Sequence, residues 1–216
     1  PKSVVMIHDF AFRYFPEAYG RLLAWWLNHE LARSAKKANR IITPSQATAQ
    51  DVSRYYGTQT NKINVVYHGV DYQRYQPLSK SELANVPKAL RSCQPYFLVL
   101  GRLETRKNIR RILEAYQVFR ESRESSTKLI FIGSPGYGWP TIEKNYRSLP
   151  SVIKTDVIWL GYQAENDMLP WLKSAKALIY PSLYEGFGLP ALEAMVAGVP
   201  VIASTTSSLP ELIEKA

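Results

Sequence analysis

The sequence is poor in cysteine, histidine and methionine, with 1, 3 and 3 of them in 216 residues. Cys93 alone cannot form a disulfide within the chain, so the fold does not require an oxidising compartment. No run reaches the roughly 18 unbroken apolar residues of a membrane span, because residues 22–31 are interrupted by Asn28, His29 and Glu30. There is no signal-peptide pattern. The histidines are scattered and Asp-x-Asp is absent, so we expect no metal site.

Positive charge is in excess. The chain has 27 Lys+Arg against 18 Asp+Glu, a net charge of +9. Residues 1–95 carry 13 basic and 6 acidic side chains, and residues 96–216 carry 14 and 12. The basic first part is expected to be either a solvated face or a surface for phosphates or an anionic membrane. Nucleic-acid binding is disfavoured, because the recognised interleaving of basic and aromatic residues is missing.

Short apolar runs alternate with helical patterns in the second part of the chain. The predicted strands are 96–100, 128–132, 157–160, 177–180 and 199–203, and the predicted helices are 108–121, 167–175 and 189–197. Ser208-Leu-Pro-Glu211 has the form of a capping box that opens a last helix. This alternation predicts an α/β fold with a doubly wound parallel sheet, in which ligands bind at the carboxyl ends of the strands.

The first part has fewer elements. We expect strands at 4–7, 40–43 and 62–67 and helices over 20–38 and 45–56. The helix over 20–38 is amphipathic, and its predicted apolar face consists of Leu22, Leu23, Trp26, Leu27, Leu31 and Ala35. The predicted organisation is therefore a partial first domain over 1–76, a linker over 77–94 and a second domain over 95–216.

Residues 180–193 carry the strongest motif. Gly186 and Gly188 lie between a strand and a helix start, where backbone N–H groups can approach an anion closely. Glu185 and Glu193 bracket this turn. A carboxylate repels phosphate, so these side chains suit the hydroxyls of a ribose or hexose. Together the groups describe a site for a nucleotide sugar, and the alternative is a surface turn without a ligand.

Residues 101–108, Gly-Arg-Leu-Glu-Thr-Arg-Lys-Asn, form a second motif after the first strand of this part. Gly101 frees the backbone, and Arg102, Arg106 and Lys107 place cations beside the next helix start. Cations there oppose the helix dipole unless an anion lies between them. A diphosphate would satisfy both, and the alternative is a solvated basic loop.

These motifs resemble those of a known family, the retaining, nucleotide-sugar-dependent glycosyltransferases of the GT-B fold in the group-1, mannosyltransferase-like family. The matching segments are Glu185-x7-Glu193, residues 101–108, Ile-x-x-Gly-Tyr162, His8-Asp9 and His68-Gly-Val-Asp71. The resemblance implies two Rossmann-like domains, with the acceptor mainly on the first and the donor mainly on the second. It also implies that the chain is a fragment, with an incomplete first domain and a second domain lacking its final strand and helices.

The resemblance assigns roles to individual residues. Arg102 and Lys107 match the basic pair that holds the donor diphosphate and steadies the leaving group. Glu193 matches the residue on the ribose hydroxyls, and Glu185 matches one near the transferred sugar. His8 matches a histidine that touches that sugar, although it could instead bond only to the loop backbone. We thus predict His8, Glu185, Arg102 and Lys107 as catalytic.

The other donor-binding residues that the resemblance implies supply mainly backbone groups or contact the nucleobase; they are Gly101, Tyr162, Gln163, Gly186, Phe187, Gly188 and Leu189. Asp9 is expected to orient its loop, and His68 and Gly69 are expected to be structural. One departure from the family pattern is Ala164, which stands where a helix-capping Ser or Asp is common.

The implied reaction is transfer of a hexose to a glycan or lipid-linked acceptor with retention, as in polysaccharide biosynthesis. GDP-mannose is the first expectation for the donor and a UDP-hexose the second, with no cofactor and no metal. The segment Gly133-Ser-Pro-Gly-Tyr-Gly-Trp139 also resembles mannosyltransferase branches. The expected location is cytoplasmic, with peripheral contact to the inner face of an anionic membrane.

Other functions remain open from the sequence. An epimerase or a phosphorylase can have the same fold, although no sequence context indicates the lysine-bound pyridoxal phosphate of a phosphorylase. A catalytically incomplete fragment that only binds nucleotide sugars is the non-enzyme alternative.

Overall fold

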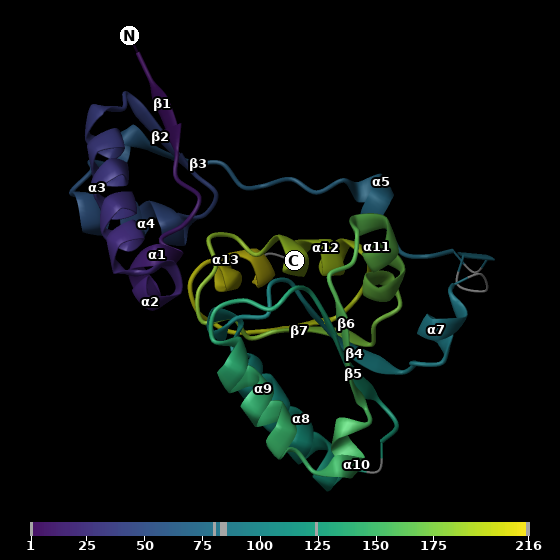
Figure 1. Ribbon diagram of the computed structural model, residues 1–216. Helices are drawn as coiled ribbons and strands as arrows, with labels where there is room; N and C mark the ends of the chain where they lie inside the picture. Colours follow the sequence, from purple (N-terminus) through teal and green to yellow (C-terminus); the bar gives the residue numbers. More distant parts are fainter. Residues whose placement is uncertain (1, 80, 83–85, 124, 215–216) are drawn as a thin grey trace. The chain divides into compact units, whose positions relative to one another are not determined.

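The computed structural model describes residues 2–79, 81–82, 86–123 and 125–214. The chain forms two compact units (Figure 1). The first unit contains the described residues of Pro1–Gly69, Leu183–Leu189 and Thr205–Ala216, and the second contains those of Val70–Ser182 and Pro190–Ser204. The domain ranges predicted from the sequence are contiguous and group 183–189 and 205–216 with the second domain. The structure groups the described residues of these two segments with the first unit, where several of them form hydrogen bonds.

A small parallel sheet organises the first unit. Its strand order is β1-β2-β3, with β1 at Val4–Met6, β2 at Arg40–Thr43 and β3 at Ile63–Val65. Val5 pairs with Ile41, which in turn pairs with Ile63. The helical elements of this unit are α1 (Ala11–Tyr14), α2 (Pro16–Tyr19), α3 (Arg21–Lys37), α4 (Gln46–Tyr56), η1 (Thr60–Lys62) and α13 (Leu209–Ile213).

The core of the first unit draws one side chain from a distant part of the sequence. Its buried members are Ile7, Phe10, Ala11, Phe12, Ala35, Ala38, Ile41, Val52 and Tyr184. Tyr184 follows the second unit's last central strand in the sequence, yet it packs here. The first unit is therefore completed by residues that come late in the chain.

The predicted apolar face of α3 is only partly buried. Ala35, near the C-terminus of the helix, is fully buried, but Leu22 is 85% exposed and Trp26 is 52% exposed. The neighbouring Trp25, which is not on the predicted face, is 67% exposed. The predicted apolar face is therefore exposed in the first turns of the helix and buried only toward its C-terminus. A 17-residue helix is about 25 Å long, whereas a three-residue strand such as β1 spans only about 10 Å. The sheet is too short to cover the whole helix.

Two different side chains satisfy the N-terminus of α4. Ser45 Oγ accepts a hydrogen bond from the Thr48 N–H at 3.0 Å, as an N-cap does. The carboxylate of Glu211, from α13, accepts from the N–H groups of Gln46 at 2.8 Å and Ala47 at 3.0 Å. A carboxylate at this positive helix end is favourable, and it joins the end of the chain to the first unit.

The predicted capping box at residues 208–211 is not formed. The Ser208 side chain makes no cap hydrogen bond to its own helix, because its hydroxyl lies 2.9 Å from the Glu185 carbonyl oxygen and 3.0 Å from that of Phe187. Glu211 is committed to α4. The sequence pattern is present, but both Ser208 and Glu211 form hydrogen bonds outside their own helix.

The second unit has a larger parallel sheet in the order β6-β5-β4-β7-β8. Its strands are β4 (Tyr96–Leu100), β5 (Lys128–Ile132), β6 (Val157–Gly161), β7 (Ala177–Tyr180) and β8 (Val201–Ala203). Each predicted strand of this part is thus found, with β8 beginning later than expected. The helical elements are α5 (Tyr72–Tyr75), α7 (Lys88–Arg91), η2 (Thr105–Lys107), α8 (Ile109–Ser122), α9 (Trp139–Ser148), α10 (Ser151–Lys154), α11 (Glu165–Lys173) and α12 (Leu189–Val196).

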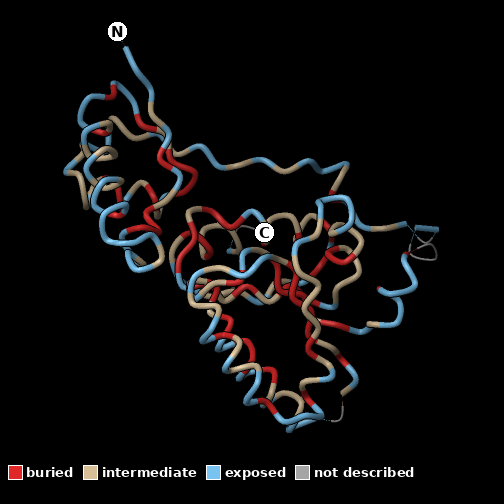
Figure 2. Tube along the Cα trace, in the orientation of Figure 1, coloured by how far each residue is buried: buried red, intermediate tan, exposed pale blue. Residues whose placement is uncertain are grey.

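Apolar packing holds the second unit together. Buried segments run along its strands and along one side of its helices (Figure 2). Leu98 and Ile130 are fully buried, and the rings of Phe131 and Trp159 stack at 4.1 Å. Continuous apolar strands of this kind are typical of a parallel sheet covered on both faces.

The strand order fixes where ligands are expected. The chain moves outward from β4 through β5 to β6 and then returns to β7 on the other side of β4. Such a reversal leaves a crevice at the carboxyl ends of the two strands that flank it. The loops that follow β4 and β7 are residues 101–108 and 181–188, which are the two motifs of the sequence.

The predicted linker contains the short helix α7 where it is described. Residues 80 and 83–85 of that stretch lie outside the described residues, α7 falls within it, and α5 precedes it. None of the helices in the described part of the chain is long and apolar enough to cross a membrane.

Candidate functional site

The predicted site residues fall into two groups, one in each unit. The first unit contains His8, Glu185, Gly186, Phe187, Gly188 and Leu189, and the second contains Gly101, Arg102, Lys107, Tyr162, Gln163 and Glu193. Each group is described by itself.

In the second unit, the loops after β4 and β5 touch backbone to backbone. Gly133 has φ +148°, and a Cβ on it would lie 2.0 Å from the Gly101 carbonyl oxygen. The Leu103 N–H donates to the Ser134 carbonyl at 2.9 Å. A side chain at Gly133 would therefore separate the two loops, so glycine is required there on both steric and conformational grounds.

Lys107 is a buried cation within this arrangement. It is 8% exposed, and its Nζ donates to the Tyr180 hydroxyl at 2.8 Å. The amine lies 3.7 Å from the point that a Cβ on Gly101 would occupy, so the glycine leaves the approach to it open. Asn108 Nδ2 also donates to the Pro181 carbonyl at 3.2 Å. A buried ammonium group is costly unless it has polar partners, and an anionic ligand would add a strong one.

The other cations of this motif differ from one another. Arg106 forms an ion pair with Glu104 at 2.8 Å, so its charge is balanced within the motif. The Glu104 carboxylate in the same motif is its partner. Arg102 is exposed, and its side chain passes close to Gly136, where a Cβ would lie 3.0 Å from Arg102 Cγ.

A cavity of about 430 Å³ lies beside these loops. It brings together the predicted residues Gly101, Arg102, Tyr162 and Gln163, and it is also lined by Leu100, Ile132, Gly133, Ser134, Glu165 and Met168. Tyr162 is 75% exposed, and Gln163 Nε2 is held by the Leu160 carbonyl at 2.9 Å. An exposed ring beside a fixed amide can contact a planar base.

Glu193 is joined to this region through residues that the sequence reasoning missed. Tyr75 hydrogen-bonds to Glu193 and also donates to Glu165 Oε1 at 3.0 Å. Arg74 forms an ion pair with Glu165 at 3.2 Å. Desolvation, more than any other cause, raises the pKa of Glu193, and the hydrogen bond from Tyr75 opposes that rise. Arg74 and Tyr75 are the residues that make this contact, and they could not be recognised in the sequence because they lie in a stretch without clear periodicity.

In the first unit, Gly186 packs against the end of the first loop. A Cβ on Gly186 would lie 2.3 Å from the His8 carbonyl oxygen and 2.8 Å from Asp9 Cβ. The structure therefore brings His8 and the 185–189 segment together. Asp9 Oδ1 accepts from the Ala11 N–H at 2.8 Å, which agrees with the predicted role of Asp9 in orienting its loop.

Hydroxyl groups hold the backbone around Glu185. Ser207 Oγ accepts from the Glu185 N–H at 3.1 Å and also hydrogen-bonds to the Glu185 carbonyl. Ser208 Oγ bonds to the same carbonyl, and Thr48 Oγ1 donates to the Gly186 carbonyl at 3.3 Å. Glu185 itself is 7% exposed. These bonds fix the backbone of the loop and leave its side chains to define the chemistry.

Aromatic rings border the same loop. The His8 and His68 rings stack at 6.2 Å, and His68 meets the Phe187 ring edge-on at 5.2 Å. His8 is exposed while Phe187 is buried. His68 thus contacts both of these predicted site residues.

A second polar group in this unit was missed by the sequence reasoning. The Tyr184 hydroxyl accepts from the Phe10 N–H at 2.9 Å and donates to Asp51 Oδ2 at 3.0 Å. Tyr14 donates to Asp51 Oδ1 at 2.8 Å. Burial raises the pKa of Tyr14 and Tyr184, and the nearby Asp51 carboxylate raises both pKa values further. The one sequence feature that could have indicated this group is the position of Tyr184 directly before Glu185.

Among the described residues, no group of three or more His, Cys, Asp or Glu side chains could hold a metal ion.

Known families match both parts of the chain. The model of the glycosyl transferases group 1 family matches residues 82–216. This chain belongs to that family. A model of glycosyltransferase family 4 matches residues 1–74. The family assignment expected from the motifs is confirmed for this group 1 glycosyltransferase.

Its curated relatives include polysaccharide mannosyltransferases. It is 33% identical over 218 residues to O-antigen chain mannosyltransferase B of Escherichia coli, covering 98% of this chain and 55% of that protein. It is 26% identical to O-antigen chain mannosyltransferase RfbU of Salmonella typhimurium, covering 94% and 52%. The chain thus spans about half the length of the curated relatives it matches.

Solved structures agree on the fold. HepE of Anabaena in complex with UDP-glucose matches with a TM-score of 0.80 at 21% identity, over 98% of this chain and 56% of that one. WaaG, a glycosyltransferase of lipopolysaccharide biosynthesis, matches with a TM-score of 0.77 at 20% identity, over 98% and 59%. The GT-B class and its parallel sheets flanked by helices are therefore confirmed.

Proposed function

We propose that this group 1 glycosyltransferase chain belongs to an enzyme that transfers mannose from GDP-mannose to a glycan or lipid-linked acceptor with retention. One observation carries the proposal: the buried Lys107 amine lies against Gly101, next to a cavity lined by Arg102, Tyr162 and Gln163. A fixed cation beside a polar and aromatic cavity suits a nucleoside diphosphate.

Roles in the second unit follow from the chemistry of each group. Lys107 and Arg102 hold the diphosphate, and Gly101 lets it approach the backbone. Tyr162 and Gln163 contact the base. Glu193 accepts hydrogen bonds from the ribose hydroxyls, with Tyr75 fixing its carboxylate.

Roles in the first unit concern the transferred sugar. Glu185 and His8 contact its hydroxyls, and the N–H groups of residues 186–189 serve sugar and phosphate. The backbone of this loop is held by hydroxyl groups, so its donors need little reorganisation when a ligand binds. Preorganised donors of this kind stabilise charge more effectively than mobile ones.

Bond breaking places negative charge on the leaving phosphate. Lys107 and Arg102 stabilise that charge as it develops, which lowers the barrier because the interaction is stronger in the transition state than in the ground state. The proposal includes no cofactor and no metal. Attack on the same face of the sugar, assisted by the leaving phosphate, accounts for retention.

Calorimetric titration of the chain with GDP and with UDP tests the donor assignment. The relatives named as mannosyltransferases support GDP, whereas the HepE structure holds UDP-glucose. We expect GDP to bind more tightly than UDP. Stronger binding of UDP would replace mannose by another hexose in the proposal, and failure of both to bind would overturn the donor site. Anomeric analysis of the product by NMR tests retention.

The proposal also includes peripheral contact with an anionic membrane, at the inner face in the cytoplasm. Leu22, Leu23, Trp25 and Trp26 are all exposed at the start of α3, and Arg21 begins the helix. Exposed Trp and Leu beside basic residues are typical of surfaces that enter the lipid headgroup region. Sedimentation with vesicles containing anionic lipid should be salt-sensitive and should weaken in Trp25→Gln. Equal sedimentation of that variant would reject this contact.

A further inference from the structure

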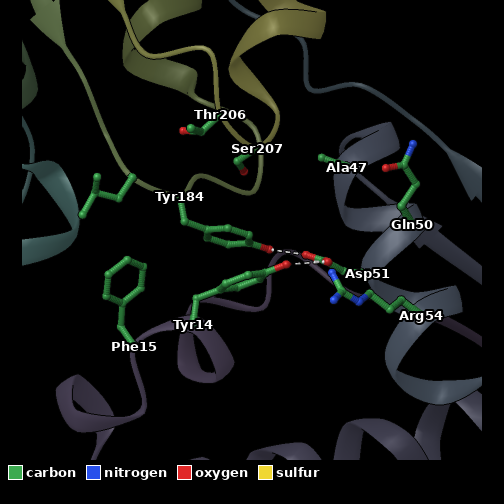
Figure 3. Close-up of a pocket in the computed structure, with 10 residues that line it drawn as sticks. Tyr14, Phe15, Ala47, Gln50, Asp51, Arg54, Tyr184, Thr206 and Ser207 are labelled. Carbon is green, nitrogen blue, oxygen red and sulfur yellow. Dashed lines mark hydrogen bonds between the residues drawn. The ribbon is translucent and has the colours of Figure 1, made fainter.

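A cavity of about 530 Å³ lies within the first unit and is not used by the roles assigned above. Tyr14, Phe15, Ala47, Gln50, Asp51, Arg54, Leu183, Tyr184, Thr206 and Ser207 line it (Figure 3). Two of these residues connect it to the Glu185 loop. Tyr184 precedes Glu185 in the chain, and Ser207 hydrogen-bonds to the Glu185 backbone. The cavity therefore adjoins the loop assigned to the transferred sugar.

The polar centre of the cavity is a fixed carboxylate. Asp51 is 7% exposed, and its two oxygens accept from Tyr14 and Tyr184 at 2.8 Å and 3.0 Å. Figure 3 shows both hydroxyls pointing toward Asp51, and the two rings stack at 4.4 Å. A carboxylate offers about four lone-pair positions, so Asp51 retains capacity to accept hydrogen bonds from a ligand.

The rim supplies groups of complementary type. Ala47, Gln50, Asp51 and Arg54 follow helical spacing along one face of α4, which places them on a common surface. Gln50 and Arg54 are exposed. The amide of Gln50 can donate and accept, and the guanidinium of Arg54 can only donate.

The ligand that fits this combination is rich in hydroxyl groups. A hydroxyl both donates and accepts, so it can pair with Asp51 and with Arg54 at once. A phosphate could pair with Arg54 but would be repelled by the carboxylate of Asp51. The cavity volume is also within the range of small-ligand sites.

We propose that this cavity binds a neutral hexose unit of the glycan acceptor, with Asp51 and Gln50 contacting its hydroxyls and Arg54 closing the rim. The assignment rests on the proposed transfer function, because it names the acceptor subsite of that reaction.

Titration of the ¹⁵N-labelled chain with α-1,2-linked mannobiose, followed by NMR, tests the proposal. We expect shift changes in the amides of Gln50, Asp51 and Arg54. Gln50→Ala and Arg54→Ala should each weaken the interaction about five-fold, the effect of one lost hydrogen bond. The matched controls Gln59→Ala, in the loop after α4, and Arg33→Ala, on α3, change exposed residues of the same unit and should leave the interaction unchanged.

Parallel titrations distinguish the two proposals. If GDP binds but mannobiose causes no shift at α4, or if the Gln50 and Arg54 variants bind it like their controls, the acceptor cavity is rejected while the donor assignment stands. If mannobiose binds at α4 and GDP does not bind, the cavity stands and the donor assignment fails. Inorganic phosphate is the anionic probe, and its preferential binding at Arg54 would overturn the choice of a neutral ligand.

Tyr14→Phe adds a readout for the carboxylate. The substitution keeps the ring that stacks on Tyr184 and removes the hydrogen bond to Asp51 Oδ1. We expect the backbone amide resonance of Asp51 to shift before ligand is added, and mannobiose affinity to fall several-fold. An unchanged affinity would remove Asp51 from the ligand contacts, contrary to the proposal.

Discussion

The second unit is built around five parallel strands whose central members are almost wholly buried. The first has three short strands and leaves the beginning of its longest helix exposed. In the second unit the predicted site residues lie on loops that follow the strands of this five-stranded sheet. In the first, hydroxyl and carboxylate side chains from separate segments hold the loop. The difference indicates that apolar packing positions the predicted donor-binding groups of the second unit, whereas polar bonds position the loop of Glu185.

Substitution of a tryptophan in each unit should give the largest contrast. Trp171 is 8% exposed and packs edge-on against Tyr96, so Trp171→Ala should cost about 3–5 kcal/mol of stability. Trp25 is 67% exposed, and Trp25→Ala should change stability by less than about 0.5 kcal/mol. Urea denaturation of both variants measures this. A similar loss of stability in both variants would mean that Trp25 is packed against the first unit and not exposed.

A methyl group at Gly186 tests the close approach of the loop in the first unit. Gly186→Ala would place its Cβ 2.3 Å from the His8 carbonyl oxygen, and relief of that contact should cost about 1–3 kcal/mol. Gly69→Ala is the matched control, because no atom lies within 4 Å of the added Cβ. Thermal denaturation should separate the two variants, and equal midpoints would argue against tight contact at His8.

Removal of the buried amine tests the second unit as the donor unit. Lys107→Ala should weaken GDP binding by about 1.5–3 kcal/mol, the worth of a charge-assisted hydrogen bond. Lys144→Ala, which removes an exposed amine on α9, should bind GDP like the unchanged chain. Calorimetry provides both affinities. Because Lys107 also bonds to Tyr180, circular dichroism of the variant checks that the fold is retained.

The smallest expected effect concerns pH. Desolvation raises the folded-state pKa of Glu193 above its ordinary value of 4.5, so the folded chain binds a proton more readily than the unfolded chain. Stability should therefore rise as pH falls through the raised pKa and level off below 4.5. Glu193→Gln should lose this contribution, and Glu30→Gln on α3 should keep it. Urea denaturation across this range gives the answer, and identical pH profiles for both variants would contradict it.

Much of the second unit could be predicted from the sequence. Four of its five strands, β4 to β7, are apolar runs that end at glycine or proline, and such local patterns survive because the sheet buries both faces. The helix α9 was not predicted, since glycine and proline in residues 133–140 obscured its start, and α10, with four residues, is too short to show a helical period. The positions of Gly101, Lys107, Tyr162 and Gln163 followed from strand ends.

The first unit was less predictable, because long-range partners override its local patterns. The Ser208 and Glu211 side chains match a capping box, but they bond to Glu185 and to α4 instead. The apolar face of α3 was recognised, but its exposure depends on the length of the sheet beneath it. The contact of Asp51 with Tyr184 joins residues 133 positions apart, and no local pattern indicates such a pair.

The first unit contains segments that are synthesised after most of the second unit, and this order affects when the first unit can fold. The first unit requires Tyr184 for its core and Glu211 for the start of α4, and both emerge from the ribosome after the whole of residues 70–182. The second unit's central strands, in contrast, are complete by Tyr180. Domains generally fold as units and the earlier one folds first. Here the unit that begins the chain is the last to acquire all its stabilising contacts.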